Sequence, residues 1–302
     1  MPREHQLDPT LAAVVRGQTG ASWSRARALC AQGRVTVDGE RCLDPALRVP
    51  AGAAVVVDQQ GPRLDRGPLA KDAIVYSDRD VVVVDKPPGM LTVADEAGNR
   101  DTLVEYTRTV LRRAGAGDVG LGVVHRIDRD TSGLVVFTRT AEAKRVLAAS
   151  FRDHDIERLY HAIAHGRVAE ASIESDLVMD RGDGLRGSHG SRRRARGEAP
   201  AGAKRSITHV RPVAALKGAT LVECRLETGR QHQIRIHLSE QGHPVVGERV
   251  YIRDYAGPRI EAPRTMLHAR TLGFAHPRSG ERLAFECEPP ADFQAIVAAL
   301  GG

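Results

Sequence analysis

The segment HRIDRDTSG, residues 125–133, concentrates the side chains with the clearest potential for chemistry. Asp128 has Arg126 and Arg129 as sequence neighbours, and a carboxylate close to cations stays ionised, as a nucleophile or base must. The apolar run at 121–124 predicts a buried strand that delivers these polar residues to a sheet edge, where pockets form. A polar turn explains the same letters equally well, because Asp, Ser and Gly are the residues that turns use.

A second segment, LETGRQHQIRIHL at 226–238, carries Arg230, His232, Arg235 and His237. An arginine can bind a carboxylate through two parallel hydrogen bonds and fix its orientation, and Arg or His can equally face phosphates. The spacing of His232 and His237 does not align two imidazoles on one helix face, and no third ligand presents itself, so no metal site is expected. A polar surface helix is the remaining alternative.

One competing enzyme class uses the letters of the first segment. A strand followed by Asp128-x-Asp130-Thr131 resembles the aspartate-nucleophile motif of magnesium-dependent phosphatases of the haloacid dehalogenase type. That motif places the first aspartate directly after the strand and an acidic pair near the end of the domain. Here two residues intervene and no adjacent acidic pair follows residue 134, so this class is disfavoured. Phosphate-loop, dinucleotide-binding and serine-hydrolase motifs are absent.

The elements that must position both segments predict an α+β domain. Helices are expected at 101–115, at 141–154 after a cap at Thr140 and at 291–300. Segment 231–242 is ambiguous, because its IRIHL core alternates as a strand does, but its bounding Gly residues and its length favour a short helix. Strands are expected at 74–76, 81–84, 121–127, 133–140, 159–168, 206–216, 219–228 and 282–290. The strands at 206–216 and 219–228 should pair around Lys217-Gly218. The irregular grouping of helices favours a large mixed, mainly antiparallel sheet flanked by helices over a regular βαβ repeat.

Upstream, residues 10–58 predict a small α/β block of two helices, a hairpin and a strand. Ser22 or Ser24 is the candidate N-cap of the second helix, Gly33 its candidate stop, and Asp38-Gly39 the hairpin turn. Residues 1–9 are interpreted as a tail and residues 59–70, rich in Gly, Pro and charge, as a linker, which leaves 71–302 as the main domain.

Charge is distributed unevenly along the 302 residues. The formal net charge is +6, and segment 181–205 alone holds eight Lys or Arg against two acids, which equals that excess. We interpret this segment as an exposed basic insertion, and a polyanion such as RNA is its natural partner, although a solvated loop without a partner has the same composition.

The four cysteines, Cys30, Cys42, Cys224 and Cys287, form no C-x-x-C pair, so neither disulfides nor a thiolate zinc site is expected. No apolar run is long enough for a membrane span and no secretory signal is visible, so a cytoplasmic protein, by default a monomer, is expected.

Several strings together resemble the RluA-type pseudouridine synthase family. HRIDRDTSG is similar to the family's catalytic motif and LETGRQHQIRIH to its arginine motif. Four further strings are similar to the remaining blocks of the family and occur in the same order: DKPPGMLTV (85–93), ERLYHAIAHG (157–166), GHPVVGERVY (242–251) and MLHARTLGFAHPRSGE (266–281). Residues 10–58 resemble, more loosely, the S-four-like (alpha-L) RNA-binding module that often precedes this domain.

The resemblance implies roles for individual residues. Asp128 would be the catalytic aspartate, Tyr160 would stack on or bond near the target uracil, and Arg235 would pair with Asp128. Arg126 would help to open the RNA and flip the base. Further contacts to substrate or RNA are expected from Arg129, Lys86, Arg230, His232 and, in the N-terminal module, Arg25. The sequence departs from the usual family residues at Ile127 (usually Leu), Arg158 (commonly Lys) and Glu248 (usually Asp).

The implied reaction is the isomerisation of uridine to pseudouridine within RNA, without metal or cofactor. The base detaches at N1, rotates and reattaches through C5, and Asp128 either attacks C1′ or takes a proton from C2′. A dry pocket would prevent hydrolysis of the detached intermediate. Large-subunit ribosomal RNA is the expected substrate, with tRNA as the alternative. A non-catalytic RNA-binding or ribosome-assembly protein is the rival from another class.

Overall fold

The computed structural model describes residues 8–60, 69–94, 101–117, 120–182, 184–190 and 200–301. The chain divides into two compact units, one of Met1–Pro68 with Ala94–Arg100 and one of Leu69–Val93 with Asp101–Gly302. Parts of the predicted tail, linker and basic insertion, including Arg192, Arg193, Arg194 and Arg196, lie outside the described residues. None of the described helices is long and apolar enough to cross a membrane.

The smaller unit has the predicted order of two helices, a hairpin and a strand. Its elements are α1 (Leu11–Thr19), α2 (Trp23–Ala31), β1 (Val35–Val37), β2 (Glu40–Arg41) and β3 (Val55–Val57). The hydroxyl of Ser22 accepts from the backbone of Arg25 and caps α2. Asp38 and Gly39 both adopt positive φ, as the tight turn between β1 and β2 requires. Sheet order β2-β1-β3 covers an apolar core shared with both helices.

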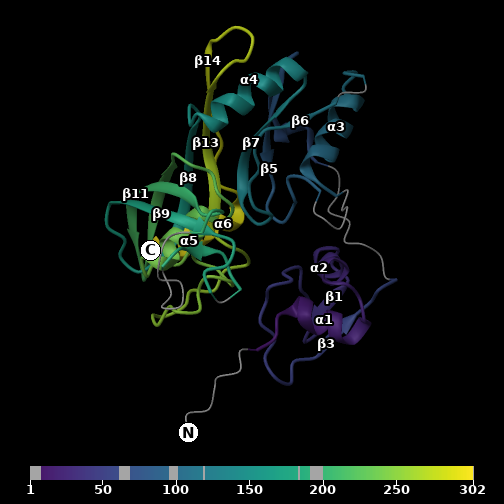
Figure 1. Cartoon of the computed structure of the whole chain (residues 1–302), viewed down its shortest axis with the longest axis vertical. Coiled ribbons are helices and arrows are strands. Elements are labelled where there is room, and N and C mark those ends of the chain that lie inside the picture. Colours follow the sequence, from purple (N-terminus) through teal and green to yellow (C-terminus); the bar gives the residue numbers. More distant parts are fainter. Residues whose placement is uncertain are drawn as a thin grey trace. The chain divides into compact units, whose positions relative to one another are not determined.

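The larger unit is built on one sheet of eleven strands (Figure 1). Its central path is β10-β9-β11-β12-β8-β13-β7-β5-β4, with β14 on β13 and β6 on β7. The strands are β4 (Ile74–Ser77), β5 (Val81–Lys86), β6 (Gly122–Val123), β7 (Ser132–Thr138), β8 (Glu157–His165), β9 (Ala171–Val178), β10 (Gly187–Ser188), β11 (Lys204–Leu216), β12 (Ala219–Leu226), β13 (Leu267–Ala275) and β14 (Arg282–Glu286). Every pair is antiparallel except β13 with β7. The predicted mixed, mainly antiparallel sheet is therefore confirmed.

The parallel contact between β7 and β13 depends on a glycine. Gly133 lies opposite Ala269 with φ of +108°, and a Cβ on Gly133 would clash with the backbone of Ala269. The two strands can approach this closely only because the position has no side chain. This approach fixes the start of β7, directly after the segment that carries Asp128.

Helices pack against the sheet in the four segments where they are expected. They are α3 (Leu103–Arg113), α4 (Ala141–Arg152), α5 (Gln233–Glu240) and α6 (Ala291–Gly301), and a short 3-10 turn covers Lys71–Ala73. The hydroxyl of Thr140 caps α4. β11 and β12 pair across the turn at Lys217-Gly218 as expected. The strands β9 and β13 carry no strong alternation and were not expected from the pattern of residues alone.

The expectation of an exposed insertion at 181–205 is wrong for several of its described residues. Gly187 and Ser188 form the edge strand β10 and are buried. Arg181 is only 4% exposed and pairs with Glu240 at 3.6 Å. A carboxylate at the end of α5 compensates this charge, which composition could not reveal because the two residues are far apart in sequence.

Candidate active site

Asp128 lies on the wall of a cavity of about 410 Å³ in the larger unit. It belongs to the turn between β6 and β7, where its carbonyl accepts from the N–H of Thr131. The volume falls within the ~300–1,000 Å³ typical of small-ligand pockets. The cavity is lined by Val124, His125, Arg126, Ile127, Asp128, Thr131, Phe151, Arg152, His154, Arg158, Tyr160, Leu226, Gly229, Arg230, His232, Gln233, Ile234, Arg235 and Leu267. The two segments singled out in the sequence thus meet here.

Two basic side chains face the carboxylate of Asp128. Nη1 of Arg235 is 3.4 Å from Oδ2, and Nε2 of His232 is 3.8 Å from Oδ1. Burial alone would raise the pKa of Asp128, but the facing His232 and Arg235 outweigh it, so the pKa is lowered below its usual value. Burial also lowers the pKa of His232, so this ring is mostly neutral near pH 7. Arg235 is then the charge that keeps Asp128 ionised.

Glu248 holds Arg235 in place. Its carboxylate accepts from Nε at 2.6 Å and from Nη2 at 2.8 Å, which leaves Nη1 to face Asp128. The side chain of Glu248 is fully buried, and Oε1 also accepts from the backbone N–H groups of Arg249, Val250 and Tyr251. Burial would raise the pKa of Glu248, but Arg235 and these N–H groups lower it overall. Sequence reasoning noted Glu248 only as a departure from the family and did not assign it this role.

Tyr251 is a second residue that sequence reasoning missed. Its hydroxyl is 2.7 Å from Nδ1 of His232, and its ring lies 5.3 Å from the guanidinium carbon of Arg235. Because Asp128 is ionised, the favoured tautomer of His232 carries its proton on Nε2, and the Tyr251 hydroxyl then donates to Nδ1. Tyr251 therefore orients the imidazole toward Asp128.

The backbone before α5 is held by Gln233, which is buried. Its side-chain oxygen accepts from the hydroxyl of Thr228 and from the N–H of Arg230, while its amide donates to the carbonyl of Ile207 and the hydroxyl of Thr208. With the turn fixed in this way, His232 adopts a left-handed backbone conformation as the residue before α5. The helix then presents Arg235 to the cavity.

Tyr160 also lines the cavity and lies on β8. It is 8% exposed. Burial raises the pKa of its hydroxyl; Arg158 opposes this shift and Asp128 adds to it. The structure thus brings Asp128, Tyr160, Arg235 and His232 to one cavity. Arg126 and Arg230 lie at the same cavity, and Arg126 is exposed.

Three other residues predicted to contact substrate or RNA do not line this cavity. Lys86 is fully buried, and its ammonium donates to the carbonyls of Pro87, Met90 and Arg129 at 2.8–2.9 Å. The predicted RNA contact through Lys86 is therefore wrong: this side chain ties two loops together in the interior. Arg129 pairs with Asp130 at 3.4 Å, and Arg25 is exposed on α2 of the smaller unit.

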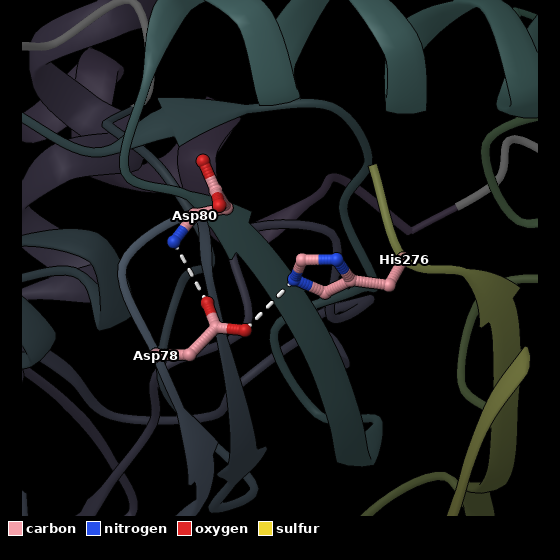
Figure 2. A group of neighbouring side chains, drawn as sticks. All are labelled: Asp78, Asp80 and His276. Atoms are coloured by element: carbon pink, nitrogen blue, oxygen red, sulfur yellow. Dashed lines mark hydrogen bonds and ion pairs between the residues drawn. The ribbon is translucent and has the colours of Figure 1, made fainter. Parts of the chain in front are cut away.

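A second polar cluster brings together Asp78, Asp80 and His276, which have the right atoms for a metal site (Figure 2). Asp78 accepts from the N–H groups of Asp80 and Val81 and bonds to His276 at 2.8 Å. Arg278 donates two hydrogen bonds to Asp80 and is the main cause that lowers its pKa to about 2. Since protein donors already use these carboxylates, we interpret the cluster as a clamp between the β4–β5 and β13–β14 turns.

Comparisons with known proteins identify relatives of both units. The family model for RNA pseudouridylate synthase matches residues 80–240, and that for the S4 domain matches residues 13–55. The ribosomal large subunit pseudouridine synthase D of Zymomonas mobilis is 37% identical over 311 residues, which cover 98% of this chain and 93% of that protein. The protein of the same name from Pseudomonas aeruginosa is 34% identical, covering 92% of this chain and 88% of that one.

A solved structure shows the same fold at low sequence identity. Human RNA Pseudouridylate Synthase Domain Containing 4 superposes with a TM-score of 0.64 at 19% identity, covering 76% of this chain and 93% of that one. The resemblance noted in the sequence is confirmed for both parts of the chain. The chain belongs to the RNA pseudouridylate synthase family of isomerases, with an S4 domain ahead of the synthase domain.

Proposed function

We propose that this protein converts uridine to pseudouridine in large-subunit ribosomal RNA and that Asp128 is the residue that acts on the ribose. The supporting observation is that Asp128 lies in a small cavity with its carboxylate kept ionised by Arg235. An ionised carboxylate can attack C1′ or take the C2′ proton, and either step releases the base from the sugar. Tyr160 supplies an aromatic wall against which a flipped uracil can stack.

The choice of RNA rests on the relatives. Both bacterial relatives described above are named for the large ribosomal subunit, and the S4 domain offers a second RNA-binding module. Exposed Arg126 and half-buried Arg230 at the cavity are suited to phosphate contacts. A ribosomal substrate would place the enzyme in the cytoplasm.

Tritium release from RNA labelled at uridine C5 tests this proposal. The substrates are ribosomal RNA that lacks its own modifications and tRNA, and the proteins are the wild type, Asp128→Asn and the matched control Asp130→Asn, whose carboxylate is paired with Arg129. We expect release from ribosomal RNA that resists a chelator, disappears in Asp128→Asn and persists in Asp130→Asn. Binding without release would favour a non-catalytic assembly protein, release from tRNA alone would change the substrate, and chelator-sensitive activity would overturn the metal-free mechanism.

A further inference from the structure

Arg158 is a buried cation on the wall of the active-site cavity. It lies on β8 two residues before Tyr160, so both side chains project from the same face of the strand. It is only 7% exposed, and its guanidinium carbon lies 5.6 Å from the ring of Phe151. Gly229 faces it: a Cβ there would clash with Nη1 of Arg158. The guanidinium therefore occupies space that any other residue at 229 would narrow.

The charge of Arg158 has no carboxylate to balance it among the described residues. Nη2 of Arg158 donates to the carbonyl of Glu227 at 2.9 Å. Its Nε is buried and makes no hydrogen bond to any residue that the structure describes. Two other arginines are as deeply buried there, and each has an acidic partner: Arg181 pairs with Glu240, and Arg264 with Asp292. Burial lowers the pKa of Arg158, as expected for a desolvated cation without a counterion.

An uncompensated buried cation is costly unless a negative charge arrives in the cavity. The proposed reaction delivers one. If Asp128 attacks, a C1′–O bond forms as the C1′–N1 bond breaks; if it takes the C2′ proton, the C2′–H electron pair becomes the C1′–C2′ double bond as N1 leaves. In both routes the C1′–N1 pair stays on the uracil, so one negative charge moves from the carboxylate of Asp128 to the base.

We propose that Arg158 is a catalytic residue that donates hydrogen bonds to a uracil carbonyl oxygen and stabilises the negative charge on the detached base. The proposal rests on the proposed function, since it needs the C1′–N1 bond to break. Charge moves from the side of the cavity where Arg235 and His232 face Asp128 to the side formed by Tyr160 and Arg158. Fixed donors that meet charge as it develops lower a barrier without reorganisation.

A backbone phosphate is the competing occupant, and the burial pattern disfavours it. The cavity has other arginines that reach solvent: Arg126 is exposed, and the side chain of Arg152 is 74% exposed. These residues can meet phosphates of a strand lying across the opening. Arg158 is buried beside Tyr160, where a flipped base would lie.

The first test separates binding from chemistry. Arg158→Met should lower kcat for pseudouridine formation by about 10²-fold, the cost of losing one such donor, and leave KM and RNA affinity unchanged. Arg145→Met is the matched control, since Arg145 is exposed on α4 away from the cavity and pairs only with Glu142 among the described residues. A rise in KM with unchanged kcat would overturn the proposal and indicate a phosphate contact.

The second test varies the leaving group. Fluorine at C5 stabilises the uracil anion, so the loss caused by Arg158→Met should be smaller on RNA with 5-fluorouridine, measured as disappearance of N-linked fluorouridine by mass spectrometry. An equal loss on both substrates would show that Arg158 acts structurally. Gly229→Ala keeps the charge but displaces the guanidinium, and should lower kcat in the same substrate-dependent way, which keeps the test available if Arg158→Met does not fold. Activity of the wild type that Asp128→Asn abolishes establishes the proposed function independently of either result.

Discussion

Glu248 binds Arg235 through two hydrogen bonds and so leaves one guanidinium nitrogen free to face Asp128. Arg235 alone could adopt many rotamers. A flexible guanidinium would neither stay at a constant distance from the carboxylate of Asp128 nor fix the orientation of that carboxylate. The buried carboxylate of Glu248 removes that freedom. It is fixed in turn by the N–H groups of the three residues that follow it. The orientation of the candidate catalytic group therefore depends on a residue that does not line the cavity.

Replacement of Glu248 tests this dependence. Glu248→Gln removes the charge that holds Arg235 and should lower kcat by about 10²-fold, because small displacements of reacting groups have effects of that size. It should also lower the melting temperature, since the buried guanidinium of Arg235 loses the nearer of its two carboxylate partners. Glu248→Asp keeps the charge and should retain more activity than Glu248→Gln. Single-turnover rates and thermal melts measure both effects, and a wild-type rate in Glu248→Gln would show that Arg235 is positioned by other contacts.

Arg235 and His232 should differ in how they affect the pH profile. Because the pKa of Asp128 is lowered, the base form should persist below the usual Asp value of ~3.9, and no acid limb from Asp128 should appear near neutral pH. Arg235→Gln removes one of the positive charges that lower this pKa and leaves only His232 and Arg126 to oppose burial, so any acid limb should move to higher pH. His232→Gln should change the profile less above pH 7, where the imidazole is mostly neutral. The pH dependence of kcat/KM of both variants measures this, and matching profiles would contradict it.

The sequence predicted the members of the site better than their connections. Asp128 and Arg235 stand in segments with recognisable chemistry, and the short helix α5 was expected from its length and its flanking residues. Glu248 and Tyr251 lie in a loop without regular structure, and nothing local indicates that they pack under α5. Their roles depend on long-range folding, which the spacing of residues does not encode.

Lys86 is a residue that was predicted to contact RNA but is buried. The RNA contact was expected of Lys86 because DKPPGMLTV resembles a block of the synthase family, and burial of a charged group is rare enough that sequence alone does not suggest it. In the structure three carbonyl groups surround its ammonium. One of them belongs to Arg129, so Lys86 supports the turn that carries Asp128 instead of touching RNA.

Lys86→Met should therefore act on stability rather than on RNA binding. The substitution keeps most of the volume but leaves three carbonyl groups without their donor, and should lower the free energy of unfolding by at least about 3 kcal/mol. At a temperature where the variant is folded, its affinity for RNA and the salt dependence of that affinity should equal those of the wild type, because no phosphate contact is lost. Urea titration and filter binding measure the two quantities. A reduced salt dependence would restore Lys86 as an RNA contact.

The clamp formed by Asp78, Asp80 and His276 should make the larger unit sensitive to acid. Arg278 is the main cause that lowers the pKa of Asp80, to about 2, below the ~3.9 of an unfolded chain. A lowered carboxylate pKa stabilises the fold fully above the unfolded value and loses that contribution as the pH falls toward 2. Asp80→Asn should thus be less stable than the wild type at pH 7, with a difference that shrinks below pH ~4.

The matched control for the clamp is Glu142→Gln, which removes an exposed ion pair with Arg145 on α4. Such a pair contributes little, so this variant should unfold like the wild type. Urea unfolding at pH 7, 4 and 3 compares the three proteins, with and without a chelator. An equal destabilisation of Asp80→Asn at every pH would show that the ionisation of Asp80 does not matter. A chelator effect that the wild type shows and Asp80→Asn lacks would show instead that Asp78, Asp80 and His276 bind a metal, because the hydrogen bonds from Arg278 to Asp80 do not depend on one.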